Sequence, residues 1–128
     1  MHFYLVKIIK HLSERNFFWL AVIWTVIITV LSLVSFHSVP KIKIIGNDKM
    51  IHFLFYLVFV ILWGLARKKT YFNHKYVLFI VISAVSYGII IEVLQGVLTS
   101  TRQADFYDVL ANTAGAIVGS VILFVVKK

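Results

Sequence analysis

The 128-residue chain contains no cysteine, one proline, six glycines and five acidic residues. The absence of cysteine excludes disulfides, a thiol nucleophile and thiolate metal ligands. So little proline and glycine excludes collagen-like and proline-rich segments. Charged residues make up only 14% of the chain, whereas soluble domains carry about 25%. A soluble domain of this length could not hide a composition that is 61% hydrophobic, because small domains keep much of their surface in contact with water.

The chain consists mainly of four long apolar runs separated by charged residues. The runs cover residues 17–36, 50–66, 76–98 and 109–126, and Glu92 is the only charged residue within them. A helix rises about 1.5 Å per residue, so about 17–25 residues span a hydrocarbon core that is about 30 Å thick. Backbone groups in lipid must be hydrogen bonded within their own segment, which requires helices. We therefore predict an all-α membrane protein with four transmembrane helices and short loops.

Two regions are expected along the chain, a basic stretch at residues 1–16 and a membrane domain at residues 17–128. The basic stretch is compatible with a short helix lying at the membrane surface and equally with a simple basic tail. Basic residues also precede a secretory signal, but the first apolar run is too long for one and no small-residue cleavage site follows it. We therefore expect the first run to be a retained anchor.

The 13 lysine and arginine residues, which outnumber the acidic residues and give the chain a net charge of +8, all lie outside the apolar runs. If both termini are cytoplasmic, nine of these residues lie inside and four outside, which is the arrangement that the positive-inside rule favours. The sequence therefore predicts a multi-pass protein with both termini in the cytoplasm. The positive charge is then explained by topology, and we expect no binding to nucleic acid.

Polar residues gather at the predicted outer ends of the last three apolar runs, on shared helical faces. The helix expected around the second run carries Asp48, just before the run, with His52 and Tyr56 in it, spaced i, i+4 and i+8. The third contributes Glu92 and Gln95, spaced i and i+3. We therefore predict a polar cleft between the last three helices that opens to the exterior.

A stripe of polar and small residues begins just before the fourth run and continues into it in steps of three and four: Asp105, Asp108, Asn112, Gly115 and Gly119. Its two glycines form a small-xxx-small seam, which is typical of close helix packing in membranes. Its polar part would lie at the rim of the cleft beside Arg102 of the preceding loop. As structural alternatives, Asp48 and Asp108 would be N-terminal helix caps, and Asp105 would form a loop ion pair with Arg102.

Glu92 is the strongest single indication of function. Ionisable residues inside a membrane span are rare, face the protein interior and often mark a functional site. The structural alternative is that Glu92 pairs with His52 or Arg102 and only holds the helices together. For Asn112, a hydrogen-bonding link between helices is favoured over a role in ligand binding.

Three segments of the chain match a known pattern: DKMIHF at residues 48–53 with Tyr56 one turn later, IEVLQ at residues 91–95, and RQADFYD at residues 102–108. Together with the asparagine and glycines that follow, they resemble the VanZ-like family of small bacterial membrane proteins over residues 48–119. The family often has glycine before the arginine, where this chain has Thr101. The resemblance implies a protein of the bacterial cytoplasmic membrane. The founding member of the family is associated with resistance to teicoplanin, a glycopeptide that binds cell-wall precursors.

Three functions are compatible with these residues. The first is a binding module in which Arg102 and Lys49 hold the phosphate or carboxylate of a lipid-linked cell-wall precursor or a glycopeptide-related ligand. The second is an intramembrane enzyme that acts on a lipid headgroup, with His52 or Glu92 as general base. The third is a small proton-coupled transporter built around Glu92. The predicted ligand-binding set is Asp48, Lys49, His52, Tyr56, Glu92, Gln95, Arg102, Asp105, Asp108 and Asn112.

A metal site is a less favoured alternative. His52, Asp105 and Asp108 could supply ligands to a divalent ion, but no local signature such as His-x-x-x-His supports one. The sequence therefore predicts no metal and no cofactor. Membrane lipids are the expected partners.

Overall fold

The structure is a computed structural model that describes residues 4, 14–33, 48–68, 72–98 and 105–126. Its four helices are α2 (Glu14–Leu33), α3 (Asp48–Leu65), α4 (His74–Leu98) and α5 (Phe106–Val126). No strand occurs in the described part of the chain, so the prediction of an all-α fold is confirmed. Most of the basic stretch at residues 1–16 lies outside the described residues.

Three helices, α2, α4 and α5, are long and apolar enough to cross a membrane. The apolar part of α3, Lys49–Leu65, is shorter and lies near the lower limit of about 17 residues for a span. Spanning by three helices therefore follows from length and composition. A fourth crossing by α3 remains a prediction.

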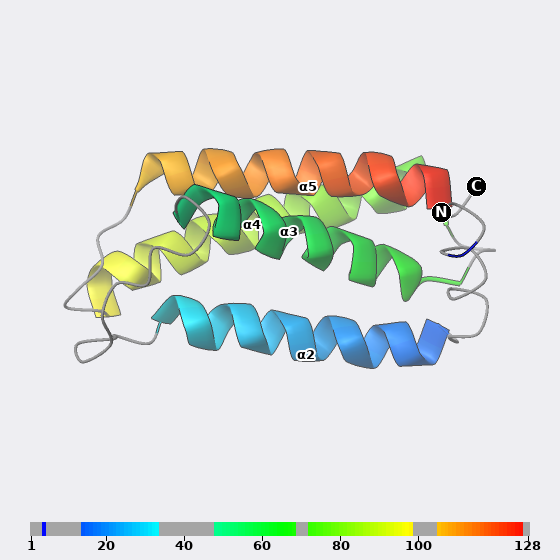
Figure 1. The fold of residues 1–128 in the computed structure, drawn as a ribbon, viewed down its shortest axis with the longest axis horizontal. Coiled ribbons are helices and arrows are strands. Elements are labelled where there is room, and N and C mark those ends of the chain that lie inside the picture. The colour runs from blue at the N-terminus through cyan, green and yellow to red at the C-terminus, as the bar shows by residue number, and fades with distance from the viewer. Residues whose placement is uncertain (1–3, 5–13, 34–47, 69–71, 99–104, 127–128) are drawn as a thin grey trace.

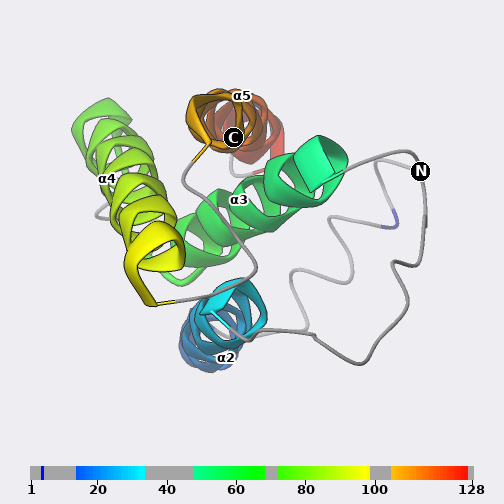
Figure 2. The same cartoon turned by 90° about the vertical axis from the view of Figure 1, so that its left-hand side faces the viewer.

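Consecutive helices run antiparallel along the long axis of the molecule (Figure 1). The C-terminal ends of α2 and α4 lie at the same end of the bundle as the N-terminal ends of α3 and α5, on the left of that view. Seen from that end, α3 lies between the other three helices (Figure 2) and packs against each of them, most extensively against α5. Residues at the start of α3, the end of α4 and the start of α5 are therefore brought to one end of the bundle.

The last three helices begin two or three residues before the predicted apolar runs. For α4 and α5, capping groups set the start. The side chain of Asn73 accepts a 2.8 Å hydrogen bond from the backbone N–H of Tyr76 in the first turn of α4. Asp105 accepts a 2.8 Å bond from the N–H of Tyr107 at the start of α5. Both are N-cap contacts, which satisfy backbone donors that the helix leaves free. The cap of α5 is thus Asp105, and Asp108 lies in the first turn.

Apolar side chains fill the interior between the helices and also cover the outside. One buried cluster joins α2, α3, α4 and α5: Ile28, Tyr56, Phe59, Val60, Ile80, Ala84 and Ala116. A second lies nearer the opposite end: Phe17, Leu65, Val77 and Leu123. Large apolar side chains such as Phe79, Val97 and Val121 are more than half exposed on the outer faces. Helices that are apolar on every face are typical of a membrane environment.

The two glycines of the predicted seam lie directly against the backbone of α3. A Cβ atom added at Gly115 would lie 2.1 Å from the carbonyl oxygen of Phe53, and one at Gly119 would lie 2.7 Å from that of Leu57. Both distances are far inside van der Waals contact. The absence of side chains at these positions therefore sets how closely α5 approaches α3, and so where the polar residues above the seam are placed.

Candidate functional site

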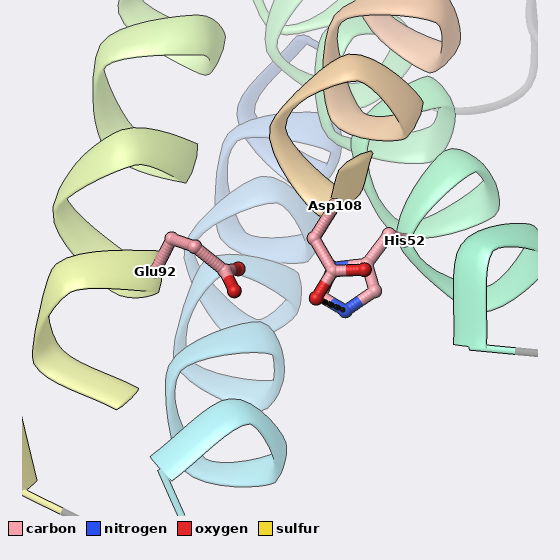
Figure 3. Close-up of side chains that lie close together, drawn as sticks. All are labelled: His52, Glu92 and Asp108. Atoms are coloured by element: carbon pink, nitrogen blue, oxygen red, sulfur yellow. Dashed lines mark ion pairs between the residues drawn. The ribbon is translucent and has the colours of Figure 1, made fainter. Parts of the chain in front are cut away.

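Five polar side chains from three helices meet at the end of the bundle where α3 and α5 begin and α4 ends. We call this group the polar centre; it consists of Lys49, His52, Glu92, Asp105 and Asp108. In Figure 3, Glu92 points from α4 toward Asp108 of α5 and His52 of α3. These residues come from three separate parts of the chain. They meet because consecutive helices run in opposite directions, which brings the start of α3, the end of α4 and the start of α5 to the same end of the bundle.

Lys49 and Asp108 form the main ionic contacts of the polar centre. The Nζ atom of Lys49 lies 2.7 Å from Oδ2 of Asp105 and 2.5 Å from Oδ1 of Asp108. The other oxygen of Asp108 lies 3.4 Å from Nε2 of His52. The side chains of Lys49 and Asp105 are 39% exposed, whereas those of His52 and Asp108 are only 12% and 11% exposed. The polar centre therefore has an open outer part and a nearly closed inner part.

Asp105 belongs to the open part and is held in its charged form. Hydrogen bonds from the Lys49 ammonium and from the backbone N–H of Tyr107 keep the pKa of the Asp105 carboxyl below its usual value. Hydrogen bonds to a carboxylate favour ionisation in this way. Lys49 therefore has a charged partner at neutral pH even before Asp108 is considered.

Glu92 belongs to the closed part and is only 4% exposed. Its Oε1 atom accepts a 2.7 Å hydrogen bond from the backbone N–H of Asp105, which ties the end of α4 to the cap of α5. Its Oε2 atom is buried and has no hydrogen-bond partner. A buried polar atom without a partner is costly, so this oxygen is available to a ligand that brings a donor or a positive charge.

Three members of the polar centre can ligate a metal ion together. His52, Glu92 and Asp108 each offer one ligand atom, and these atoms lie within 4.8 Å of one another. An imidazole nitrogen with two carboxylates is a mixed nitrogen and oxygen donor set that suits first-row divalent ions. The group differs from the set weighed on the sequence alone, because Glu92 takes the place of Asp105.

A second polar layer lies one helical turn below the polar centre. Tyr56 follows His52 by one turn on α3, and Asn112 follows Asp108 by one turn on α5. Both are almost fully buried, and neither the Tyr56 hydroxyl nor Asn112 Oδ1 has a hydrogen-bond partner. Gly88 of α4 leaves room for this layer, since a Cβ there would lie 2.8 Å from Asn112 Nδ2.

The remaining predicted site residues lie elsewhere or outside the described part. Gln95 donates a 2.9 Å hydrogen bond to the backbone carbonyl of Ser32, so it joins α4 to α2. Arg102 and the side chain of Asp48 lie outside the described residues. The polar centre that the structure shows is therefore formed by five residues of the predicted set, with Tyr56 and Asn112 beneath them.

Sequence patterns did not predict a hydrogen-bonded region on the side of α3 that faces α2 and α4. There the Trp63 indole donates to Thr25 Oγ1 at 3.1 Å, and the Tyr87 hydroxyl contacts Thr29 and donates to the carbonyl of Thr25 at 3.3 Å. The adjacent cavity of about 330 Å³ is lined mainly by aromatic side chains of α3 and α4. The spacing of the two threonines was visible in the sequence, but their partners lie on other helices and no local pattern identifies them.

Comparison with known proteins gives one family match. A sequence model of the family described as VanZ/LLP1 matches residues 3–127 of the 128-residue chain. No curated protein and no solved structure matches the chain significantly. The matched range contains all four helices and every residue of the polar centre.

Proposed function

The chain belongs to the VanZ/LLP1 family, and from this premise we propose that it is a cell-envelope membrane protein whose polar centre, with the second polar layer beneath it, binds the headgroup of a lipid-linked ligand. One observation carries the proposal. Glu92 Oε2, the Tyr56 hydroxyl and Asn112 Oδ1 are buried without partners, although buried polar groups in proteins are nearly always hydrogen bonded. A headgroup rich in hydroxyl and amide groups would supply the missing partners.

The charge of the polar centre bears on which part of a headgroup it can hold. The sequence predicts that Lys49 and Arg102 bind a phosphate or carboxylate. Lys49 already contacts two carboxylates, so an anion would have to compete with Asp105 and Asp108 for the same ammonium. The described residues therefore favour binding of the sugar and amide part of a cell-wall precursor. A direct contact between Lys49 and the phosphate of the precursor is disfavoured.

The proposed setting is the bacterial cytoplasmic membrane, with four crossings and both termini inside. Three basic residues, Arg67, Lys68 and Lys75, lie between or next to the ends of α3 and α4 that are remote from the polar centre. The positive-inside rule places that end in the cytoplasm, so the polar centre would face the exterior, where wall precursors are used. The aromatic cavity between α2, α3 and α4 would accommodate part of the lipid chain. A role in glycopeptide resistance would then arise from shielding the precursor.

Native mass spectrometry of the full chain in nanodiscs tests this proposal. The ligands are a lipid-linked disaccharide-peptide precursor, a polyprenyl phosphate and a phosphatidylglycerol. We expect the precursor to bind most tightly, and we expect Asn112→Ala and Tyr56→Phe each to weaken it by up to about tenfold, since one hydrogen bond is worth about 0.5–1.5 kcal/mol. Ser120→Ala, lower on the same helix as Asn112, is the matched control and should bind normally. Equal affinity for all three lipids, or unchanged binding by both variants, would refute the proposal.

A lipid-headgroup hydrolase is the second candidate function. It is favoured by the contact between His52 Nε2 and Asp108 Oδ2 at 3.4 Å, because a carboxylate beside an imidazole can orient it as a general base. Release of inorganic phosphate from polyprenyl phosphates or diphosphates by wild-type protein, and its loss in His52→Gln, would support hydrolysis. If the lipids stay intact after prolonged incubation with protein that still binds them, hydrolysis is excluded and binding remains as the function.

Transport is less favoured than either function. A transporter would need a polar path through both halves of the membrane, and the described residues offer no charged side chain in the bundle interior away from the polar centre.

A further inference from the structure

Carboxylates outnumber fixed positive charges in the polar centre. Glu92, Asp105 and Asp108 face a single permanently charged cation among the described residues, Lys49, whose ammonium contacts only the two aspartates. Like charges held close together in a nearly closed site must be compensated by a proton or by another cation. The inner part of the centre therefore has a net demand for positive charge.

The geometry of the inner part meets that demand with ligand atoms. One atom each from His52, Glu92 and Asp108 lies within 4.8 Å of the others. Independently of this clustering, Glu92 is 96% buried and its Oε2 atom has no partner. In Figure 3 the Glu92 carboxylate is directed at Asp108 and His52. The Glu92 carboxylate, which carries the unpartnered oxygen, thus faces the space that a cation between the three side chains would occupy.

We propose that His52, Glu92 and Asp108 bind a divalent cation of the zinc or manganese class. Mixed imidazole and carboxylate ligands suit these ions, whereas Ca²⁺ and Mg²⁺ prefer oxygen ligands throughout. Three protein ligands leave a coordination position open, as in catalytic zinc sites. That position would take a hydroxyl or amide carbonyl oxygen of the headgroup, a role that rests on the proposed function. The cation site itself does not depend on it.

Lys49 is the natural competitor of such a cation. Its ammonium lies 2.5 Å from Oδ1 of Asp108 and leaves Oδ2 on the side of His52. When a metal binds, Lys49 retains Asp105 as a partner at 2.7 Å, so the charge of Asp108 can pass to the metal. Removal of the ammonium should therefore strengthen metal binding, whereas removal of a ligand should weaken it.

The experiment uses untagged full-length protein in nanodiscs, stripped with a chelator and without added precursor lipid. Zn²⁺, Mn²⁺ and Co²⁺ are titrated by calorimetry and by competition with a chromophoric chelator, and bound metal is counted by elemental analysis. We expect one equivalent of Zn²⁺ or Mn²⁺ with micromolar or tighter Kd, retained in a large excess of Mg²⁺ and Ca²⁺. A folded wild-type protein that binds none of the three ions would overturn the proposal and indicate that Glu92 and Asp108 share a proton instead.

Four variants then locate the ion. Glu92→Gln keeps the oxygen that accepts the Asp105 N–H and should fold. Glu92→Gln and His52→Ala should each weaken metal binding by at least about tenfold, the scale of losses seen even for outer partners of metal ligands. Lys49→Gln should bind more tightly than wild type, a gain that a purely structural role would not produce. His74→Ala, exposed at the opposite end, is the matched histidine control. Wild-type affinity in both His52→Ala and Glu92→Gln would place the ion elsewhere and refute this site. Because no precursor is present, either result is independent of the lipid-binding test.

Discussion

Two aspartates at the start of α5 have different roles although they are only three residues apart. Asp105 caps the helix through the N–H of Tyr107 and pairs with Lys49 at the open edge of the polar centre. Asp108 is buried and contacts both Lys49 and His52. The charge of Asp105 therefore acts mainly on Lys49 near water, whereas that of Asp108 determines the chemistry of the inner part.

The Asp105 charge predicts a pH-dependent stability. Asp105→Asn removes the charge but keeps an oxygen that can cap α5. Because the folded-state pKa of Asp105 lies below its usual value, about 3.9 in an unfolded chain, the ionised form stabilises the fold. This contribution to stability is complete above the pKa of Asp105 in the unfolded chain. It is lost as the pH falls through the lower pKa of Asp105 in the folded protein. Thermal unfolding from pH 7 to pH 3 should therefore show a small deficit for Asp105→Asn that disappears in acid.

The same substitution in a Lys49→Gln background serves as the control for this prediction. Without the ammonium, the charge of Asp105 has lost its main partner but keeps the hydrogen bond from the Tyr107 N–H, so the pH-dependent deficit of Asp105→Asn should be smaller than in the wild-type background. A deficit of constant size from pH 7 to pH 3, or an equal deficit in both backgrounds, would contradict the role assigned to the ion pair.

At the level of helices, the pair α3 and α5 forms the most extensive contact of the bundle, and the glycine seam controls it. The backbone carbonyls of Phe53 and Leu57 occupy the places where side chains at positions 115 and 119 would lie. Backbone cannot move aside as a flexible side chain can. The seam therefore sets the separation of the two helices and, one to two turns above it, the distance between Asp108 and the residues of α3.

Alanine at the seam should push α3 and α5 apart. We expect Gly115→Ala to lower the free energy of unfolding by about 2 kcal/mol, within the usual range of overpacking, and Gly119→Ala to cost less because its contact is less tight. Gly96→Ala on the exposed face of α4 is the matched control and should be neutral or stabilising by up to about 1 kcal/mol. Denaturant unfolding in mixed micelles measures all three. Equal stability of Gly115→Ala and Gly96→Ala would contradict the role of the seam.

For the whole molecule, the two ends of the bundle differ in chemistry. One end carries the polar centre with its carboxylates, and the other carries the exposed basic residues Arg67, Lys68 and Lys75. Large apolar side chains cover the outer surface between the ends. This polarity along the axis is what a fixed orientation in a membrane requires, since basic residues are retained on the cytoplasmic side.

The cysteine-free chain allows a direct test of that orientation. A single cysteine replacing Tyr107, exposed beside the polar centre, should react with a membrane-impermeant maleimide in intact cells. A cysteine replacing Asn73, at the start of α4, should react only after the cells are permeabilised. The reverse labelling pattern would invert the proposed topology, and labelling of both sites in intact cells would exclude a fixed four-crossing arrangement with these two sites on opposite sides.

The sequence was sufficient for the fold class, the positions of the helices and the end at which polar residues gather. Long apolar runs and helical spacing are local properties, and antiparallel order follows from consecutive crossings. The helix starts were predicted less well, because Asn73 and Asp105 cap α4 and α5 ahead of the apolar runs, and the first turns of these helices include His74, Lys75 and Asp108. The family resemblance over residues 48–119 also came from local motifs, and the match to residues 3–127 confirms it.

Contacts between helices could not be read from local patterns. Gln95 shares a face with Glu92, yet it bonds to Ser32 of α2, while Glu92 turns toward Asp108 and His52. The metal ligands weighed on the sequence alone were His52, Asp105 and Asp108, whereas in the structure Asp105 pairs with Lys49 and Glu92 takes its place. These choices depend on the rotation of each helix about its axis and on its distance from its neighbours. Both are set by packing across the bundle, above all at Gly115 and Gly119, and packing involves residues that are far apart along the chain.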